Sequence, residues 1–181
     1  MPGKTLRPLR ILRHLLVPDW WVRRAFPAAL VARIEAAVAA SERCHRGELR
    51  IVAEAGLPLA SLLGGECGNQ GAGQATDAVR ARAIDLFAAL RVWDTAGNSG
   101  VLIYLQLVDR RVEIVADRGI DACVGSAFWR DVCVPLETAL HAGDFEGGLL
   151  AAIERIEAAL IAHFPARADN PNELPDRPLV L

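Results

Sequence analysis

An almost unbroken run of apolar residues from Val101 to Val108 is the clearest pattern in the chain. Such a run is typical of a strand that is covered on both faces of its sheet. A second strand is predicted from Val112 to Ala116, and the polar Asp109-Arg110-Arg111 between the two is short enough for a hairpin turn. Because an antiparallel hairpin brings its outer ends together, we expect Asn98 and Asp117 to be neighbours.

Apolar positions before and after this hairpin follow helical spacing, with one further strand. Leu30, Ile34 and Val38 recur every four residues, as on the buried face of a helix. Leu49 and Ile51 instead alternate with other residues, as in a strand. Together the patterns predict helices at about 27–43, 76–92, 127–140 and 144–164, and a first strand at 48–55.

The order of these elements predicts the fold class. Helix, strand, helix, strand, strand, helix, helix is expected for an α/β fold, here a three-layer α/β/α sandwich of Rossmann-like shape. The first two strands should be parallel because a helix connects them, and the hairpin adds an antiparallel member. The sheet is therefore predicted to be mixed, with a central β-hairpin. Within the helix at 127–140 we expect Pro135 to cause a kink or a break.

Three parts are expected along the chain. They are a basic amphipathic N-terminal arm at 1–25, an α/β domain at 26–165, and a proline-rich tail at 166–181 that is extended or disordered. In the arm, leucines share one helical face and arginines another. The leucines are Leu9, Leu12, Leu15 and Leu16, and the arginines are Arg7, Arg10 and Arg13.

The arm has two interpretations. In the first, it docks on its own domain or on a second copy of the chain. In the second, residues 5–24 form an interfacial helix on a membrane surface, since Trp20, Trp21 and several arginines flank the apolar face. In either case His14 is expected on the solvated side of the helix.

Composition and charge narrow the choice of function. The chain has 181 residues, of which 52% are hydrophobic, so it can bury a sizeable core. Its formal net charge of −2 argues against general nucleic-acid binding, although residues 1–26 carry six basic residues against one acidic residue. The apolar pieces near the start are too short and too often interrupted by arginine for a secretory signal or a bilayer-spanning helix. We therefore expect a cytoplasmic protein, with attachment at the inner membrane face as an alternative.

Candidate catalytic chemistry is sparse. Cys44, Cys67, Cys123 and Cys133 show no CxxC spacing, which argues against zinc or thioredoxin-like chemistry. The glycine-rich segment 64–73 lacks the spacing of a phosphate-binding loop. The four histidines lie far apart in the sequence, and neither a cysteine-phosphatase nor an aspartate-phosphatase motif is present. The residues therefore predict no nucleophile–base pair.

A site for a hard cation is the main candidate. Asp94, Asn98 and Asp117 should gather at one edge of the sheet, and their carboxylate and amide oxygens suit Ca²⁺ or Mg²⁺. The alternative is that these side chains cap turns or pair with a nearby arginine. At the opposite edge, Asp109-Arg110-Arg111 forms either an anion-binding rim or a solvated hairpin tip.

Several short motifs occur in the order seen in TPM domains. The chain resembles that family over about residues 26–165, and most of all its small bacterial members without a signal. The motifs are Phe26-Pro27, Glu48-Leu-Arg-Ile-Val52, Ala83-x-x-Leu86-Phe87, Asn98-Ser-Gly-Val-Leu-Ile103, Asp109-Arg110, Arg118-Gly119-Ile120 and Gly143-Asp144-Phe145-x-x-Gly148-Leu149.

The resemblance implies a Rossmann-like sandwich without dinucleotide binding. The family includes proteins linked to photosystem II repair, an auxiliary subunit of an ion channel and bacterial envelope proteins. Acid phosphatase activity has been ascribed to the plant type, and divalent metal binding to some members. The paired aspartates that many members carry early in the domain are not evident here.

We therefore expect a non-catalytic accessory or interaction module. Its partner would be an unknown protein, a second copy of the chain or a membrane surface. The alternative is a divalent-metal-dependent phosphatase or related hydrolase that uses Asp94, Asn98 and Asp117 as ligands.

Overall fold

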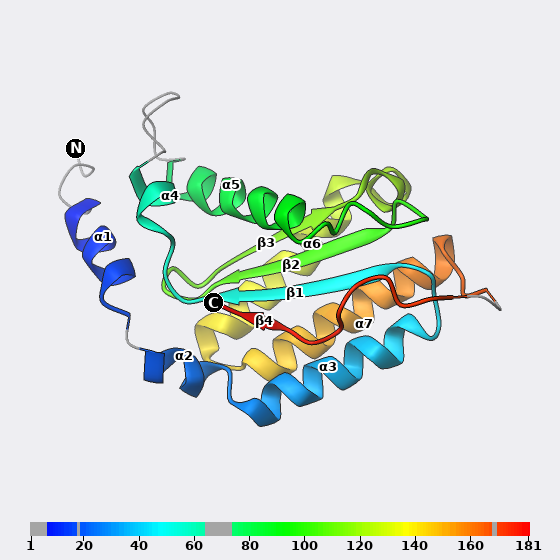
Figure 1. The fold of residues 1–181 in the computed structure, drawn as a ribbon, viewed down its shortest axis with the longest axis horizontal. Helices are drawn as coiled ribbons and strands as arrows, with labels where there is room; N and C mark the ends of the chain where they lie inside the picture. Colours follow the sequence, from blue (N-terminus) through cyan, green and yellow to red (C-terminus); the bar gives the residue numbers. More distant parts are fainter. Residues whose placement is uncertain (1–6, 18, 64–73, 168–169) are drawn as a thin grey trace.

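A mixed four-stranded sheet forms the middle layer of the computed structural model, which describes residues 7–17, 19–63, 74–167 and 170–181 (Figure 1). The spatial order of the described strands is β3-β2-β1-β4. Their bounds are β1 (Glu48–Glu54), β2 (Gly100–Gln106), β3 (Arg111–Ala116) and β4 (Leu179–Val180).

Helices cover both faces of this sheet and one of its ends (Figure 1). One face packs against α3 (Ala28–Glu42), α6 (Arg118–Ala142) and α7 (Phe145–His163), and the other against α4 (Leu59–Leu63) and α5 (Gln74–Ala89). The arm forms α1 (Arg7–Leu15) and α2 (Asp19–Ala25), and α1 lies at the end of the sheet where β1 finishes. The predicted α/β/α sandwich is confirmed.

The predicted hairpin forms between β2 and β3. These strands are antiparallel, with Val101 opposite Ala116. β1 and β2 are parallel along their whole length, and Glu54 lies opposite Gln106 at their carboxyl ends. The hairpin turn, residues 107–110, follows directly, so the carboxyl ends of the two parallel strands and the turn meet at one end of the sheet.

Two hydrophobic clusters, one on each face of the sheet, explain the apolar run in β2. Val101, Ile103 and Leu105 belong to the cluster that includes α3, α6 and α7, whereas Leu102 and Tyr104 belong to the cluster that includes α5. All seven residues of β2 are buried, as expected for an inner strand between two helical layers.

Helix α6 is broken at Gly125 and not at the predicted Pro135. Gly125 has φ 74° and ψ 167°, a backbone conformation that glycine adopts without a side-chain clash. Pro135 lies within the helix. The predicted boundary between α6 and α7 is confirmed, because Gly143 takes a left-handed φ of 83° and the Asp144 carboxylate accepts a hydrogen bond of 2.8 Å from the N–H of Gly147.

The described part of the tail at 170–181 packs along β1 and ends in β4, which pairs parallel with β1. Side chains of the domain hold its backbone. The buried Arg50 guanidinium donates to the carbonyls of Pro175 and Arg177 at 2.5 and 2.6 Å, and Glu48 Oε2 accepts from the N–H of Leu174 at 3.0 Å. Of the two predicted states of the proline-rich tail, extended or disordered, the described part at 170–181 is extended.

Candidate functional site

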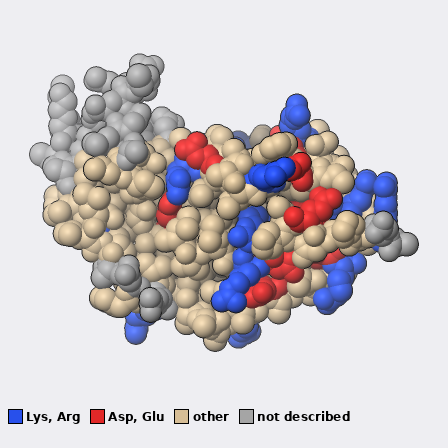
Figure 2. Space-filling view, viewed as in Figure 1, with Lys and Arg blue, Asp and Glu red and all other residues tan. Residues whose placement is uncertain are grey.

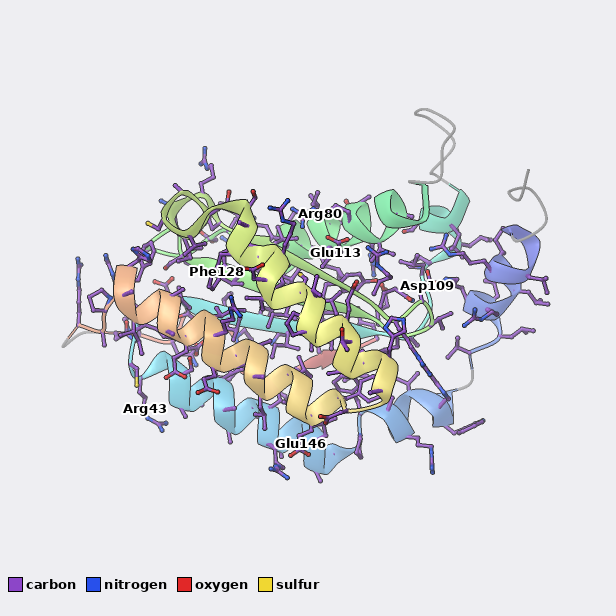
Figure 3. All side chains as sticks on the ribbon, turned by 180° about the vertical axis from the view of Figure 1, so that it is seen from behind. Arg43, Arg80, Asp109, Glu113, Phe128 and Glu146 are labelled. Atoms are coloured by element: carbon purple, nitrogen blue, oxygen red, sulfur yellow. The ribbon has the colours of Figure 1, made fainter. Side chains whose placement is uncertain are left out.

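The arm docks at the carboxyl ends of β1 and β2 through its polar face. The Arg10 guanidinium donates twice to Asp109 Oδ2, at 2.6 and 3.1 Å. Asp109 lies at the hairpin turn, 99 residues further along the chain. His14 is buried between the helix and the domain, and the carbonyl of His14 packs closely over Gly56. Figure 3 shows Asp109 at the end of the molecule where α1 lies.

Both ring nitrogens of His14 have partners. Its Nδ1 accepts from the N–H of Leu57 at 3.0 Å, so the proton of the neutral ring lies on Nε2, which donates to Asp109 Oδ2 at 3.2 Å. Burial alone would raise the pKa of Asp109, but the hydrogen bonds from His14 and Arg10 and the Arg10 charge outweigh it and hold that pKa below its usual range. Asp109 therefore carries a charge that the arm neutralises. The expectation that His14 lies on the solvated side is wrong.

A second polar cluster lies nearby on the α5 side of the sheet. Glu54, the last residue of β1, is buried and accepts three hydrogen bonds from the Arg82 guanidinium at 2.6, 3.1 and 3.1 Å. The hydroxyl of Tyr104 donates to the same carboxylate at 2.6 Å. Burial raises the pKa of Tyr104, and the neighbouring Glu54 charge raises it further. The carboxylate is thus fully hydrogen-bonded.

Neither cluster is arranged for acid–base catalysis. A general base needs a lone pair directed at a substrate, but the lone pair of His14 accepts a backbone N–H. Tyr104 is fully buried, and Glu54 is held by an arginine and a hydroxyl. The side chains of the two clusters instead stabilise the docked arm and the ends of β1 and β2.

The two polar turns at the opposite end of the sheet lie side by side, as the hairpin predicts. The N–H of Asp117 donates to the carbonyl of Gly100 at 2.8 Å, and the N–H of Ile120 donates to the carbonyl of Asn98 at 3.3 Å. The Asp117 side chain caps α6, with Oδ1 accepting from the N–H of Arg118 at 2.7 Å. Its Oδ2 is buried and has no hydrogen-bond partner among the described residues.

The other members of the predicted cation site are exposed. Asp94 forms an ion pair with Arg91, three residues earlier. Asn98 has a left-handed φ of 48° in its turn. Asp121, a further carboxylate in the first turn of α6, accepts from the indole N–H of Trp129 at 2.8 Å. Within the described ranges, no three His, Cys, Asp or Glu side chains are grouped closely enough to hold a metal ion, so a site at Asp94, Asn98 and Asp117 stays a prediction.

The hairpin turn contains a half-buried carboxylate and an exposed arginine. Asp109 is the half-buried member, and the exposed Arg110 donates to the carbonyl of His141 at 3.1 Å. Arg111 forms an ion pair with Glu137 of α6 at 3.0 Å. Of the three residues that predicted an anion-binding rim or a solvated tip, Arg110 is the exposed one, and Asp109 and Arg111 are half-buried.

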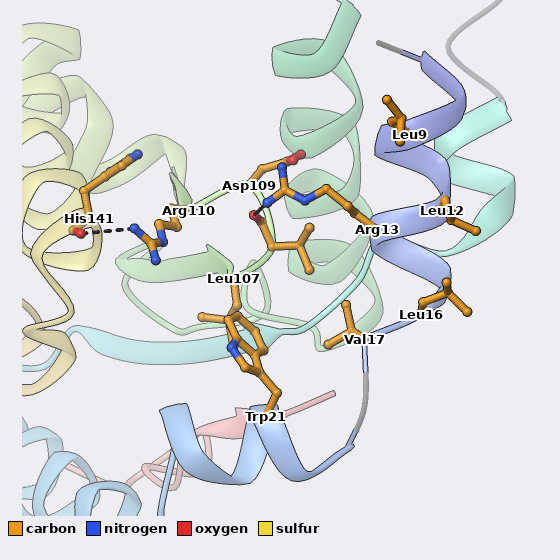
Figure 4. Close-up of a pocket in the computed structure, with 11 residues that line it drawn as sticks. Leu9, Leu12, Arg13, Leu16, Val17, Trp21, Leu107, Asp109, Arg110 and His141 are labelled. Atoms are coloured by element: carbon orange, nitrogen blue, oxygen red, sulfur yellow. Dashed lines mark hydrogen bonds between the residues drawn. The ribbon is translucent and has the colours of Figure 1, made fainter.

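An open cleft of about 740 Å³ lies between the arm and this turn (Figure 4). Its walls are mostly apolar, and arginine side chains lie beside them. The residues that line the cleft are Leu9, Leu12, Arg13, Leu16, Val17, Trp21, Leu107, Val108, Asp109, Arg110 and His141. Trp20 does not line the cleft; its side chain is 65% exposed, whereas Trp21 packs partly against the core.

The three described cysteines give no sign of a reactive centre. Cys44 and Cys123 are free and exposed, and burial raises the pKa of the Cys133 thiol to about 12. Cys67 and the glycine-rich segment 64–73 lie outside the described residues.

Sequence patterns missed His14, Arg82 and the role of Glu54. One signal was available for the second cluster. Tyr104 is the only tyrosine of the chain and lies in an otherwise apolar strand, so its hydroxyl required a buried partner. For His14 the sequence signal was misleading, because the apolar face of an amphipathic helix normally meets the core and His14 lies on the other face.

Comparison with known proteins gives a family match and a structural relative. A family model described as the TPM domain matches residues 24–159. The structure is similar to the NMR structure of the BA42 protein from the psychrophilic bacterium Bizionia argentinensis, with a TM-score of 0.68 and 27% sequence identity. The similarity covers 85% of this chain and 94% of that chain. Among curated proteins, none matches.

Proposed function

Since the chain belongs to the TPM domain family, we propose that it is a non-catalytic accessory module that attaches to an anionic membrane surface through its N-terminal arm. The proposal combines the family with the orientation of α1. No helix in the described part of the chain has the length and apolar character needed to cross a bilayer. Attachment would therefore be peripheral for these residues.

The outward direction of the leucines carries the proposal. In α1 the polar side chains of Arg10 and His14 face the domain, whereas Leu9, Leu12, Leu15 and the residue after the helix, Leu16, are each at least 50% exposed. A surface helix normally buries its apolar face against its own core. An apolar face directed at solvent marks a surface that meets a membrane or a partner.

Charge and aromatic content favour a membrane as the partner. The segment 1–26 has six basic residues and one acidic residue, and the exposed Trp20 lies just beyond the leucine face. Basic residues are attracted to anionic lipid head groups, and tryptophan is enriched at the membrane–water interface. Figure 2 shows charged side chains gathered over the centre and right of one face of the molecule, away from the end where α1 lies, so on that face the attraction to a membrane would come mainly from apolar surface.

Co-sedimentation with vesicles tests the attachment. Vesicles that contain phosphatidylglycerol should pellet the wild-type protein, and a variant with Leu9→Gln, Leu12→Gln and Leu16→Gln should stay in solution. A matched control replaces the exposed Ile84, Val134 and Ile161 by glutamine, because these apolar residues lie on other helices. Equal pelleting of the two variants would refute a role for the arm. If the wild type stays in solution with vesicles but sediments as a dimer by ultracentrifugation, the leucine face binds a second copy instead.

The alternative function is a divalent-metal-dependent phosphatase or related hydrolase. One observation favours it: Asp117 Oδ2 is buried without a hydrogen-bond partner among the described residues, and a cation would satisfy it. Asp94 and Asn98 would supply further oxygen ligands. In an NMR titration with Ca²⁺ or Mg²⁺ the amide signals around Asn98 and Asp117 should shift, and an Asp117→Asn variant should lose the response. Unchanged spectra at millimolar metal would exclude this site.

A further inference from the structure

The cleft beside the arm has the size of a small-molecule site. Its volume of about 740 Å³ lies within the range of pockets that bind small molecules and cofactors. One wall comes from α1 and the following residues up to Val17, another from α2 through Trp21, and the third from the hairpin turn. The cleft therefore exists only while the arm is docked.

Apolar side chains provide most of the binding surface. Leu107 is buried, Trp21 is half-buried, and Val17 lies near both of them (Figure 4). Leu9, Leu12 and Leu16 extend this surface along α1. A continuous apolar surface of this kind gains free energy when a hydrocarbon chain removes it from water.

Two arginines beside the cleft have no carboxylate partner among the described side chains. Arg13 donates to the carbonyl of Val108 at 3.1 Å, and Arg110 donates to the carbonyl of His141 at 3.1 Å. A guanidinium has five N–H donors, so each arginine keeps donors for a ligand. In Figure 4, Arg13 reaches in from α1 and Arg110 from the hairpin. Asp109 is the acidic residue of the cleft, and the arm's own Arg10 already pairs with it.

We propose that this cleft binds one molecule of an anionic phospholipid. The acyl chain lies on the leucines of α1 and on Trp21, and the phosphate lies between Arg13 and Arg110, whose planar guanidinium groups suit phosphate oxygens. The inference rests on the proposed membrane attachment and adds detail to it. The docked arm would bind one lipid molecule in the cleft as well as contacting the membrane surface with its leucines. A zwitterionic phosphatidylcholine keeps this phosphate but adds a choline cation, which the two arginines repel.

A water-soluble lipid tests the site without a membrane. Dihexanoyl phosphatidylglycerol, kept below its micelle concentration, is titrated into the full chain and followed by NMR. The indole signal of Trp21, assigned with a Trp21→Phe variant, and the amide signal of Arg110 should shift and saturate. Dihexanoyl phosphatidylcholine should bind about tenfold more weakly, because its choline cation is repelled by the two arginines.

Substitutions separate the head-group contacts from general charge. Arg13→Gln and Arg110→Gln should each weaken binding of the phosphatidylglycerol about tenfold, a loss of about 1.4 kcal/mol. Arg43→Gln is the matched control, because the exposed Arg43 also donates to a single backbone carbonyl, that of Ala39, and lies at the other end of the molecule (Figure 3). Leu12→Gln should weaken both lipids equally.

Separate outcomes apply to the site and to the membrane proposal. If the soluble lipid leaves the Trp21 and Arg110 signals unchanged while vesicles still pellet the protein, the cleft proposal is wrong and membrane attachment stands. If the lipid binds but vesicles do not pellet the protein, the cleft stands and the attachment is wrong. Equal affinity for the two head groups, or equal losses in Arg43→Gln and Arg110→Gln, would overturn the role given to the arginines.

Discussion

Replacing Glu42 by glutamine should stabilise the protein, and increasingly so as the pH rises. Glu42 is the last residue of α3 and is 8% exposed beneath the tail. Its Oε1 accepts from the N–H of Leu49 at 2.9 Å, and its Oε2 has no partner among the described residues. Burial raises the pKa of Glu42 to about 9 against the opposing effect of the Leu49 bond, and the Glu48 and Asp176 carboxylates add to the rise.

The direction of this pH dependence follows from the protonation of Glu42 in the folded and unfolded chains. Between pH 4.5 and 9 the folded chain keeps a proton on Glu42 that the unfolded chain has lost. Below pH 4.5 Glu42 is protonated in both states and does not lower the free energy of unfolding. As the pH rises from 4.5 towards 9, the protonated Glu42 of the folded chain lowers the free energy of unfolding progressively. At about 1.4 kcal/mol per pH unit, the cost reaches about 3 kcal/mol at pH 7 and grows by about 2 kcal/mol between pH 7 and 8.5.

Glutamine keeps the shape and stays neutral at every pH. Its Oε1 still accepts from Leu49, and its amide group can donate towards Asp176. The free energy of unfolding of the Glu42→Gln variant should therefore exceed that of the wild type by about 1 kcal/mol or less at pH 5 and by about 2–3 kcal/mol at pH 7. These differences are roughly the stability that the wild type loses through Glu42 at each pH. Between pH 7 and 8.5 its stability should stay level while that of the wild type falls.

Urea denaturation followed by circular dichroism measures these differences at pH 5, 7 and 8.5. Glu154→Gln on α7 is the control, because Glu154 is exposed and its substitution should shift the unfolding free energy by less than about 0.5 kcal/mol. Glu48 has a pKa raised to about 7, mainly by burial, so some slope below pH 7 should remain in the variant. Parallel curves for the variant and the wild type between pH 7 and 8.5, or a destabilised variant, would refute the reasoning.

Three further substitutions test other contacts of the fold. Asp109→Asn removes the charge that holds the arm and should raise hydrogen exchange in residues 7–17 at least tenfold, with no change in the helices that cover the sheet; unchanged exchange in the arm would contradict the docking contacts. Arg82→Gln leaves Glu54 buried without its cation and should cost about 3–5 kcal/mol in unfolding free energy, whereas the double variant Arg82→Gln with Glu54→Gln should recover most of that loss; equal values for the two would argue against the pair. Gly100→Ala should destabilise the protein by about 1–3 kcal/mol by urea denaturation, since a Cβ there would lie 1.9 Å from the carbonyl oxygen of Val92, and a stability equal to the wild type would rule out this close approach.

The sheet could be predicted because each of its elements carries its own local signal. The apolar run of β2 is a consequence of burial on both faces, and the short polar turn after it left a hairpin as the simplest connection. Gly143 and Asp144 mark a helix end and a helix start by conformational preference and side-chain capping. The break in α6 was predicted at Pro135 and lies at Gly125, because Gly125 adopts a positive φ that the neighbouring residues do not predict.

Buried charges could not be predicted in the same way. Glu42 at a helix end and Glu48 at a strand start are expected to be solvated, and only the tail, more than 120 residues later, covers them. Likewise, Arg10 and Asp109 are 99 residues apart, so no local pattern links them. Pairing over such distances depends on how the elements pack, which the periodicity of a single segment does not encode.

The orientation of α1 is the point at which local pattern and tertiary structure disagree, and the disagreement is informative. The leucine stripe alone predicts a helix that turns its apolar face inward. In the structure a half-buried ion pair and a buried histidine hold that helix with its leucines outward, although burying charged and polar groups is costly unless they are paired. Because the same helix, turned about its axis, would bury the leucines instead, the specific polar contacts select against the arrangement that the hydrophobic effect favours within one chain. The exposed leucine surface that results is the observation on which the proposed membrane attachment depends.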